Sequence, residues 1–215
     1  MSTEAEPKPE KEGRTGIAAV IELVVIVAVA LGLALLIQAF LVKPYKIPSG
    51  SMIPTLVEGQ RVLVNRLSHR YSDPKVGDVT VFHPPAGAGS QDGSERCGDV
   101  NQRPDQACDR PVNKPSSEYF IKRIVAGPGD VIFVRDGRLY RNGKRQKDSF
   151  TTPCGAGAGC NFERPIRIPA GHWFMMGDNR GASDDSRFWG PVPTDWIIGP
   201  AFATYWPPSR IGGID

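Results

Sequence analysis

The strongest constraint on this chain is a long apolar run near its N-terminus. Residues 17–42 contain 23 apolar side chains in 26 positions, interrupted only by Glu22, Gly32 and Gln38. A helix of ~20 apolar residues crosses the ~30 Å hydrocarbon core of a bilayer, whereas helices of water-soluble folds rarely stay apolar on every face for so long. We therefore expect residues 17–42 to form a transmembrane helix.

A cleavable signal peptide is the alternative explanation of this run. Its apolar region typically has ~7–15 residues and ends at a cleavage site of small residues. Here the run is longer and continues directly into Lys43-Pro44-Tyr45-Lys46. The sequence therefore favours an anchor that is retained.

The flanks and the cysteines bear on the orientation of the anchor. Three basic residues precede the run and two follow it within four positions, which weakly favours a cytoplasmic N-terminus. All four cysteines follow the run, and an even number fits disulfides in an oxidising compartment. We expect residues 1–16 to be a short cytoplasmic tail and residues 43–215 to be an extracytoplasmic domain.

Charge and composition narrow the class of that domain. The chain has 26 basic and 23 acidic residues, a small imbalance that does not indicate a nucleic-acid partner. Residues 43–215 hold 39 of the 44 glycines and prolines, which favours many short strands joined by turns. The fold class that we expect is mainly β: one N-terminal transmembrane helix followed by an all-β domain with long loops.

Individual strands are indicated by runs rich in β-branched and aromatic residues. They are expected at 61–66, 78–82, 119–126, 131–135 and 173–176. Asp136-Gly137 and Asn142-Gly143 are dipeptides typical of tight hairpin turns.

Two stretches, 84–117 and 148–165, lack the strand pattern and are expected to be polar surface loops. Each contains two cysteines, and a disulfide would reduce the entropy of such a loop. Of the three possible pairings we favour the local bridges Cys97–Cys108 and Cys154–Cys160. Four buried thiols remain the alternative, and a zinc site is disfavoured because the spacings contain no CxxC.

A serine-rich segment follows the anchor closely. In Pro48-Ser49-Gly50-Ser51-Met52-Ile53-Pro54-Thr55 the prolines prevent a long helix, a setting in which backbone N–H groups are left to bind an anion. Ser51 lies nine residues after Val42, so it stays within roughly 30 Å of the membrane surface even in a fully extended chain. A substrate of Ser51 is therefore expected near that surface.

A nucleophilic serine needs a base, and the sequence offers histidines or a lysine. Three histidines have no distinctive context, although a triad assembled from distant positions stays open: His69, His83 and His172. Lys122 is the better candidate, because strand alternation places it on the same face as Phe120 and Ile124, and burial lowers the pKa of an amine. A solvated strand lysine is the alternative. A second polar segment, 177–187, contains Ser183 beside several charged residues and is either a surface turn or part of the same site.

The order of these segments resembles that of the type I signal peptidases. After the apolar run come PSGSMIPTL (48–56), GDVTVF (77–82), YFIKRIVAGPGD (119–130) and MGDNRGASDDSRFWG (176–190). The resemblance runs from residue 17 to about residue 208. It implies a membrane-bound Ser/Lys endopeptidase, acting as a monomer without cofactor or metal, that cleaves signal peptides from exported preproteins after Ala-x-Ala-like sites. The implied location is the outer face of the cytoplasmic membrane, with the bilayer as a second partner.

The resemblance also implies roles for single residues. By motif position Ser51 is the nucleophile, Lys122 is the general base, and the Ser49 hydroxyl joins the Ser51 N–H in the oxyanion hole. Ser183 orients the lysine amine, supported by a charged pair formed by Asp185 and Arg187. Seven further residues are implied to line shallow apolar substrate pockets: Tyr45, Ile47, Pro48, Leu56, Val81, Phe120 and Ile121. The resemblance supports the bridge Cys154–Cys160 and offers no support for Cys97–Cys108.

The chain departs from the family pattern in two places. Gly181-Ala182 stand where many relatives have Asp-Asn, and the 39 residues between Phe82 and Lys122 make 84–117 an insertion with no implied role. Two other functions stay open, a membrane-tethered β-domain that binds an envelope partner and a membrane-anchored hydrolase that uses histidine. The aromatic residues Trp196, Phe202 and Trp206 are either core residues or contacts to lipid.

Overall fold

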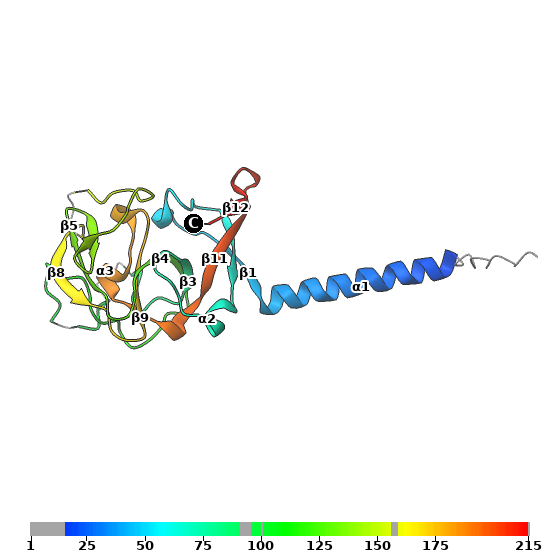
Figure 1. Cartoon of the computed structure of the whole chain (residues 1–215), viewed down its shortest axis with the longest axis horizontal. Helices are drawn as coiled ribbons and strands as arrows, with labels where there is room; N and C mark the ends of the chain where they lie inside the picture. The colour runs from blue at the N-terminus through cyan, green and yellow to red at the C-terminus, as the bar shows by residue number, and fades with distance from the viewer. Residues whose placement is uncertain (1–15, 91–95, 100, 156–158, 215) are drawn as a thin grey trace, which may run out of the picture. The chain divides into compact units, whose positions relative to one another are not determined.

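The computed structural model describes residues 16–90, 96–99, 101–155 and 159–214. The chain divides into two units, residues 1–39 and 40–215. The expected tail 1–16 lies outside the described residues except for Gly16. Figure 1 shows the long helix and the β-rich unit.

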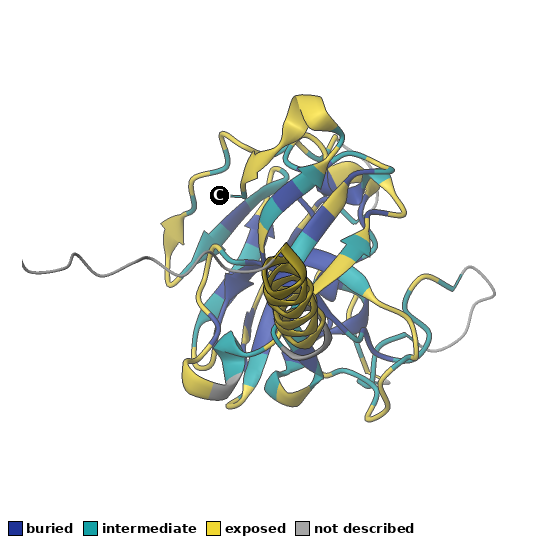
Figure 2. Ribbon diagram, turned by 90° about the vertical axis from the view of Figure 1, so that its right-hand side faces the viewer, coloured by how far each residue is buried: buried dark blue, intermediate teal, exposed yellow. Residues whose placement is uncertain are grey.

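The first unit is dominated by helix α1 (Gly16–Phe40), whose described side chains are exposed on every face (Figure 2). By length and composition, Gly16–Ile37 is able to cross a membrane. The expected helix 17–42 ends two residues early, because Val42 already belongs to strand β1 (Val42–Lys46), where it pairs with Asn65. Pro44 explains the early end, since proline lacks the N–H that a helix interior needs.

The second unit contains two antiparallel sheets in the described part of the chain. The larger sheet has the strand order β1-β2-β11-β3-β4-β9-β10, and β12 pairs with β11. Its other strands are β2 (Arg61–Asn65), β3 (Val79–Phe82), β4 (Phe120–Ala126), β9 (His172–Met176), β10 (Val192–Pro193), β11 (Ile197–Trp206) and β12 (Gly212–Gly213). The smaller sheet has the order β7-β6-β5-β8. It consists of β5 (Val131–Arg135), β6 (Arg138–Arg141), β7 (Lys144–Arg145) and β8 (Phe162–Arg167).

Helices in this unit are short. They are α2 (Ser68–Tyr71), α3 (Ser186–Trp189) and the 3-10 helices η1 (Gly50–Met52), η2 (Arg180–Ala182), η3 (Thr194–Trp196) and η4 (Pro208–Arg210). In Figure 1 the smaller sheet lies at the end of the unit away from β1 and β11. A mainly β domain after an apolar helix confirms the expected fold class.

The expected strands are present, with ends that shift by one residue. Both hairpin turns are also confirmed: Asp136 and Asn142 have φ of 52°, and the glycines after them also have positive φ. Aspartate, asparagine and glycine tolerate this left-handed conformation, which lets β5, β6 and β7 follow one another through tight turns.

Two expectations about loops need correction. The stretch 148–165 overlaps β8, in which Phe162 and Ile166 are buried although most intervening residues are exposed. The stretch 84–117 forms no strand in its described residues, yet it does not lie wholly on the surface. Ala107 is buried in the core cluster of the smaller sheet, and Cys108 has no exposed surface. Both local disulfides, Cys97–Cys108 and Cys154–Cys160, are present.

Strand β11 was not expected, because Gly199 and Pro200 interrupt its pattern. It nevertheless pairs with both β2 and β3, with register shifts on each side. Gly199 lies so close to the Asn65 carbonyl oxygen that a Cβ atom there would overlap it. Glycine is required because β11 and the end of β2 approach each other closely at this point.

Candidate active site

Ser51 lies in the middle of helix η1, and its side chain is largely buried. The segment is fixed from outside: the Asn179 N–H donates to the Ser51 carbonyl oxygen over 3.0 Å, and the Asn179 Nδ2 donates to the Gly50 carbonyl oxygen over 3.1 Å. The first N–H groups of a helix have no acceptor within the helix itself. The Ser51 N–H is therefore suited to hold an oxyanion.

Lys122 reaches the same point from strand β4. Its Nζ donates a hydrogen bond to Ser51 Oγ over 2.6 Å, and only 4% of the residue is exposed. Burial lowers the pKa of Lys122 from 10.5 to about 8, against the opposing charges of Asp185 and Asp184. A neutral amine at this distance is able to accept the hydroxyl proton, because the heavy atoms already lie within hydrogen-bond reach.

Ser49 is the third hydroxyl-bearing residue of this group. Its Oγ lies 3.3 Å from Ser51 Oγ, to which it donates. The hydroxyl therefore stands next to the atom that would attack a carbonyl, on the segment that also carries the Ser51 N–H.

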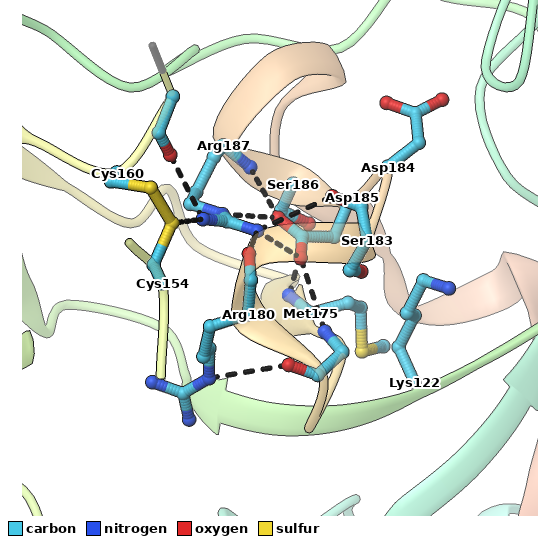
Figure 3. A network of polar contacts seen from close by, with 12 residues as sticks. Lys122, Cys154, Cys160, Met175, Arg180, Ser183, Asp184, Asp185, Ser186 and Arg187 are labelled. Carbon is cyan, nitrogen blue, oxygen red and sulfur yellow. Dashed lines mark hydrogen bonds and ion pairs between the residues drawn. A yellow bond between two sulfur atoms is a disulfide. The ribbon is translucent and has the colours of Figure 1, made fainter. Parts of the chain in front are cut away.

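Asp185 and Arg187 form a buried pair behind this group (Figure 3). Arg187 Nε lies 2.8 Å from Asp185 Oδ1, and its Nη2 lies 3.0 Å from Oδ2, so the contact is bidentate. Arg187 also donates to the carbonyl oxygens of Arg180 and Gly159. Burial alone would raise the pKa of Asp185, but the charge and hydrogen bonds of Arg187 hold it below the usual value. The pair fixes the loop that carries Ser183.

Ser183 lies on that loop, with its side chain buried. Among the described residues, its Oγ has no partner other than the Asp185 carboxylate, whose pKa it helps to lower. Gly177 makes room for it, because a Cβ at Gly177 would overlap both the Ser183 side chain and the Ser51 carbonyl oxygen. Its role in orienting the Lys122 amine stays a prediction.

A second buried ion pair, which sequence reasoning missed, ties the serine segment to β4. Arg123 Nη2 lies 2.8 Å from Asp178 Oδ2, and Thr55 Oγ1 donates to the same oxygen over 2.6 Å. Arg123 follows Lys122 directly, whereas Thr55 follows Ser51 by four residues. The Asp178 carboxylate therefore links the two segments that bring the amine and hydroxyl together. The local sequence contains no sign of this pair, because the partner of Arg123 lies 55 residues away along the chain.

Two cavities lie along this site. One of about 300 Å³ is bordered by nine residues: Pro48, Ser49, Ser51, Tyr119, Phe120, Ile121, Lys122, Ala182 and Asp184. A smaller one of about 130 Å³ is bordered by Tyr45, Lys46, Ile47, Pro48, Val81, Tyr119, Phe120 and Ile121. The structure thus places six of the seven expected pocket residues on these cavities. Leu56 lies instead in the buried cluster that contains Ile47 and Met52, and it borders neither cavity.

The remaining candidates lie elsewhere. No histidine borders either of the two cavities, and His83 is engaged through its Nδ1 with the carbonyl oxygens of Ser116 and Glu118. In the described part of the chain, no group of three or more histidine, cysteine, aspartate or glutamate side chains is arranged to hold a metal ion.

Comparison with known proteins identifies the family. Residues 20–206 match the family described as "Signal peptidase, peptidase S26". A probable signal peptidase I-1 from Synechocystis is 36% identical over 86% of this chain and 81% of the relative. Chloroplastic thylakoidal processing peptidase 1 from Arabidopsis thaliana is 34% identical over 85% of this chain, which spans about half (47%) of that relative. A crystal structure of a signal peptidase I from Enterococcus faecalis matches 60% of this chain and 97% of that chain, with 20% identity and a TM-score of 0.41.

These relatives define a class of proteases that process signal peptides. The chain belongs to the signal peptidase family, peptidase S26. It is a serine endopeptidase that cleaves signal peptides, and the N-terminal apolar helix α1 fits a membrane-anchored protein.

Proposed function

We propose that this chain is a membrane-bound signal peptidase that uses Ser51 as nucleophile and Lys122 as general base. The observation that supports this most directly is the 2.6 Å contact between Lys122 Nζ and Ser51 Oγ in a buried setting. An amine with a pKa of about 8 is neutral in about one molecule in ten at pH 7, whereas an amine with the ordinary value of 10.5 would be neutral in fewer than about one in a thousand.

The proposed reaction begins when neutral Lys122 accepts the Ser51 proton as Oγ attacks the scissile carbonyl carbon. The oxyanion that forms is stabilised by the Ser51 N–H and the Ser49 hydroxyl, each of which is worth ~3 kcal/mol in comparable enzymes. Collapse of the tetrahedral intermediate breaks the C–N bond, and protonated Lys122 gives its proton to the departing amine. The mature chain leaves while the signal peptide remains as an ester on Ser51. Lys122 then deprotonates a water molecule, which hydrolyses the ester and restores the hydroxyl.

The lining of the cavities supports specificity for apolar residues before the cut. The cavities of about 300 and 130 Å³ are walled by side chains such as Ile47, Val81 and Ile121, which are themselves buried. A charged substrate side chain would lose its hydration there without gaining a partner. Together with the resemblance of the motifs to those of the type I signal peptidases, this lining supports our proposal of cleavage after Ala-x-Ala-like sequences. We further propose that the protein acts as a monomer.

The location that we propose is the cytoplasmic membrane, with the N-terminus in the cytoplasm and residues 43–215 outside. The exposed apolar helix α1 supports the anchor, and the two disulfides support an oxidising compartment. Phe202 and Trp206 are exposed on β11 and are suited to contact lipid, whereas Trp196 packs partly against the core.

The experiment that tests the function is cleavage of a model preprotein by the full chain, followed by N-terminal sequencing of the product. Ser51→Ala and Lys122→Ala should each abolish cleavage. Lys114→Ala, at an exposed position of the insertion, is the matched control and should remain active. Replacement of all three histidines should also leave cleavage intact. Full activity of Lys122→Ala would refute the Ser/Lys mechanism, and a product that begins elsewhere than after small residues at the first and third positions before the cut would refute the specificity.

A further inference from the structure

The charges that surround Lys122 are arranged in pairs. Three carboxylates raise the proton affinity of its amine: Asp185, Asp184 and Asp178. Asp185 is paired with Arg187 and Asp178 with Arg123, and all four of these side chains are buried. These two pairs lie within the elements that build the site itself.

The third carboxylate, Asp184, is different because it borders the cavity that contains Ser51 and Lys122. Its partner comes from the insertion 84–117: Arg96 Nη1 lies 3.1 Å from Asp184 Oδ1. The Gly89 N–H, also from the insertion, donates to Asp184 Oδ2 over 2.5 Å. The side chains of Arg96 and Asp184 are 36% and 28% exposed, so this ion pair is more hydrated than the pairs Asp185–Arg187 and Asp178–Arg123.

The insertion holds Arg96 at this position through several contacts. The guanidinium of Arg96 lies 5.6 Å from the centre of the Phe188 ring, a cation–π distance. The next residue, Cys97, is bridged to Cys108, whose N–H donates to the Arg187 carbonyl oxygen over 3.0 Å. The disulfide thus connects Arg96 to the segment that carries Asp185 and Arg187.

We propose that Arg96 is a positioning residue for the cleavage reaction: by pairing with Asp184 it reduces the negative charge that the Lys122 amine faces, and it thereby sets the lower edge of the pH range in which the enzyme works. This inference depends on the proposed role of Lys122 as the base. It gives the insertion a function, which is to supply the arginine that pairs with the third carboxylate of the site.

The direction of the effect follows from the charges that face Lys122. Arg187 opposes protonation of the amine, and the three carboxylates favour it. Arg180, buried on the same loop, and Arg123 carry the other positive charges nearby. Loss of Arg96 leaves Asp184 as an unpaired charge at the cavity, so protonated Lys122 becomes more stable. The rising limb of kcat/KM then moves to higher pH.

The test is the pH profile of kcat/KM for the full chain in detergent, with a preprotein substrate. For Arg96→Ala we expect the rising limb to move up by about half a pH unit, a modest shift because the pair is partly solvated. This corresponds to about a threefold loss of kcat/KM on the acidic side and a much smaller loss on the plateau. Arg96→Lys should retain most of the wild-type profile.

Removal of the Asp184 carboxylate distinguishes an effect of charge on Lys122 from an effect of a disturbed loop. Asp184→Asn alone should move the limb to lower pH, and the double variant Arg96→Ala/Asp184→Asn should return it to the wild-type position or below. Arg103→Ala is the matched control. Arg103 pairs with Asp105 in the same insertion, and the two side chains are 61% and 62% exposed. This variant should keep the wild-type limb.

Three results would overturn the inference, and the first two are an Arg96→Ala limb at the wild-type pH and a double variant that keeps the shift of Arg96→Ala. The third is an Asp184→Asn limb that does not move, in a variant that keeps Arg96 and its contact with the Phe188 ring. The proposed function fails on a different observation, activity without Lys122. An inactive Lys122→Ala together with an unmoved Arg96→Ala limb would therefore reject this inference and leave the Ser/Lys mechanism standing.

Discussion

The buried amine of Lys122 should make the wild-type protein less stable than a variant that lacks it. Lowering the pKa of Lys122 from 10.5 to about 8 means that, below pH 8, the folded state holds a proton in an environment that disfavours it. A shift of about 2.5 units corresponds to about 3 kcal/mol. Lys122→Met keeps a similar volume and removes this cost, but it also removes the hydrogen bond to Ser51, worth about 1 kcal/mol. The variant should therefore be more stable at pH 7 by about 2 kcal/mol.

The sign of the pH dependence follows from proton binding. Between pH 8 and 10.5 the unfolded chain binds a proton on Lys122 that the folded chain does not, so the cost of burying the amine decreases as the pH rises through this window. At pH 10 the remaining cost is about 1 kcal/mol, which the lost hydrogen bond offsets. Lys122→Met should thus be about as stable as the wild type at pH 10.

Denaturant unfolding of the full chain in detergent micelles, followed by tryptophan fluorescence, measures this difference. The four tryptophans all lie in the unit 40–215, so the signal reports on that unit and not on α1. Lys114→Met, at an exposed position, is the control and should change stability by less than about 0.5 kcal/mol at either pH. A Lys122→Met variant that is less stable than the wild type at pH 7, or whose advantage is the same at pH 7 and pH 10, would refute the reasoning.

Three other perturbations test the surroundings of the site. The kcat/KM of the wild type should rise through a pKa of about 8, because only the neutral amine accepts the Ser51 proton, and a single limb near pH 6.5 would instead indicate a histidine base. Gly177→Ala should destabilise the fold by about 1–3 kcal/mol and reduce kcat about 100-fold, since the new methyl group displaces Ser183 or Ser51, and Gly212→Ala, where a Cβ meets nothing within 4 Å, should do neither. Asp178→Asn should cost about 3–5 kcal/mol of unfolding free energy, because the buried and charged Arg123 loses its bidentate carboxylate partner. A loss no larger than about 1 kcal/mol would show that the pair does not hold the serine segment.

The sequence was sufficient for the parts of the fold that depend on local pattern. The apolar run, the strands and the two hairpin turns each have a signal carried by consecutive residues of the chain. Strand β11 was missed because its position is set by two neighbouring strands, which tolerate Gly199 and Pro200 at bulges. Strand β8 was missed because only Phe162 and Ile166 face the core, and exposed residues between them make the segment look like a loop.

The candidate site also has parts that the local sequence predicts and parts that depend on distant segments of the chain. The motifs identify Ser51 and Lys122 as candidates. The contact between them joins positions 71 apart, and it depends on the packing of η1 against β4. The role of Asp178 was missed for this reason, since its two side-chain partners, Thr55 and Arg123, come from two other segments of the chain. Leu56, expected at a pocket, shows the opposite error: its distance from Ser51 along the chain is short, yet its side chain packs into the buried cluster under the sheet.

A desolvated lysine that must be neutral limits which charges can lie near it. This explains why the charged side chains around the site form ion pairs. An unpaired carboxylate would return the amine to its protonated form, and an unpaired arginine would carry its own cost of burial. Carboxylates that fix the loop 177–187 are therefore compatible with a basic Lys122 only where each has a guanidinium partner. Asp185 pairs with Arg187 two residues along the chain, and Asp178 pairs with Arg123 on β4. Asp184 borders the cavity, and among the described residues its cationic partner is Arg96 of the insertion. A chain that places an aspartate at position 184 thus needs a cation from another segment, and the disulfide-bridged insertion is the segment that supplies it.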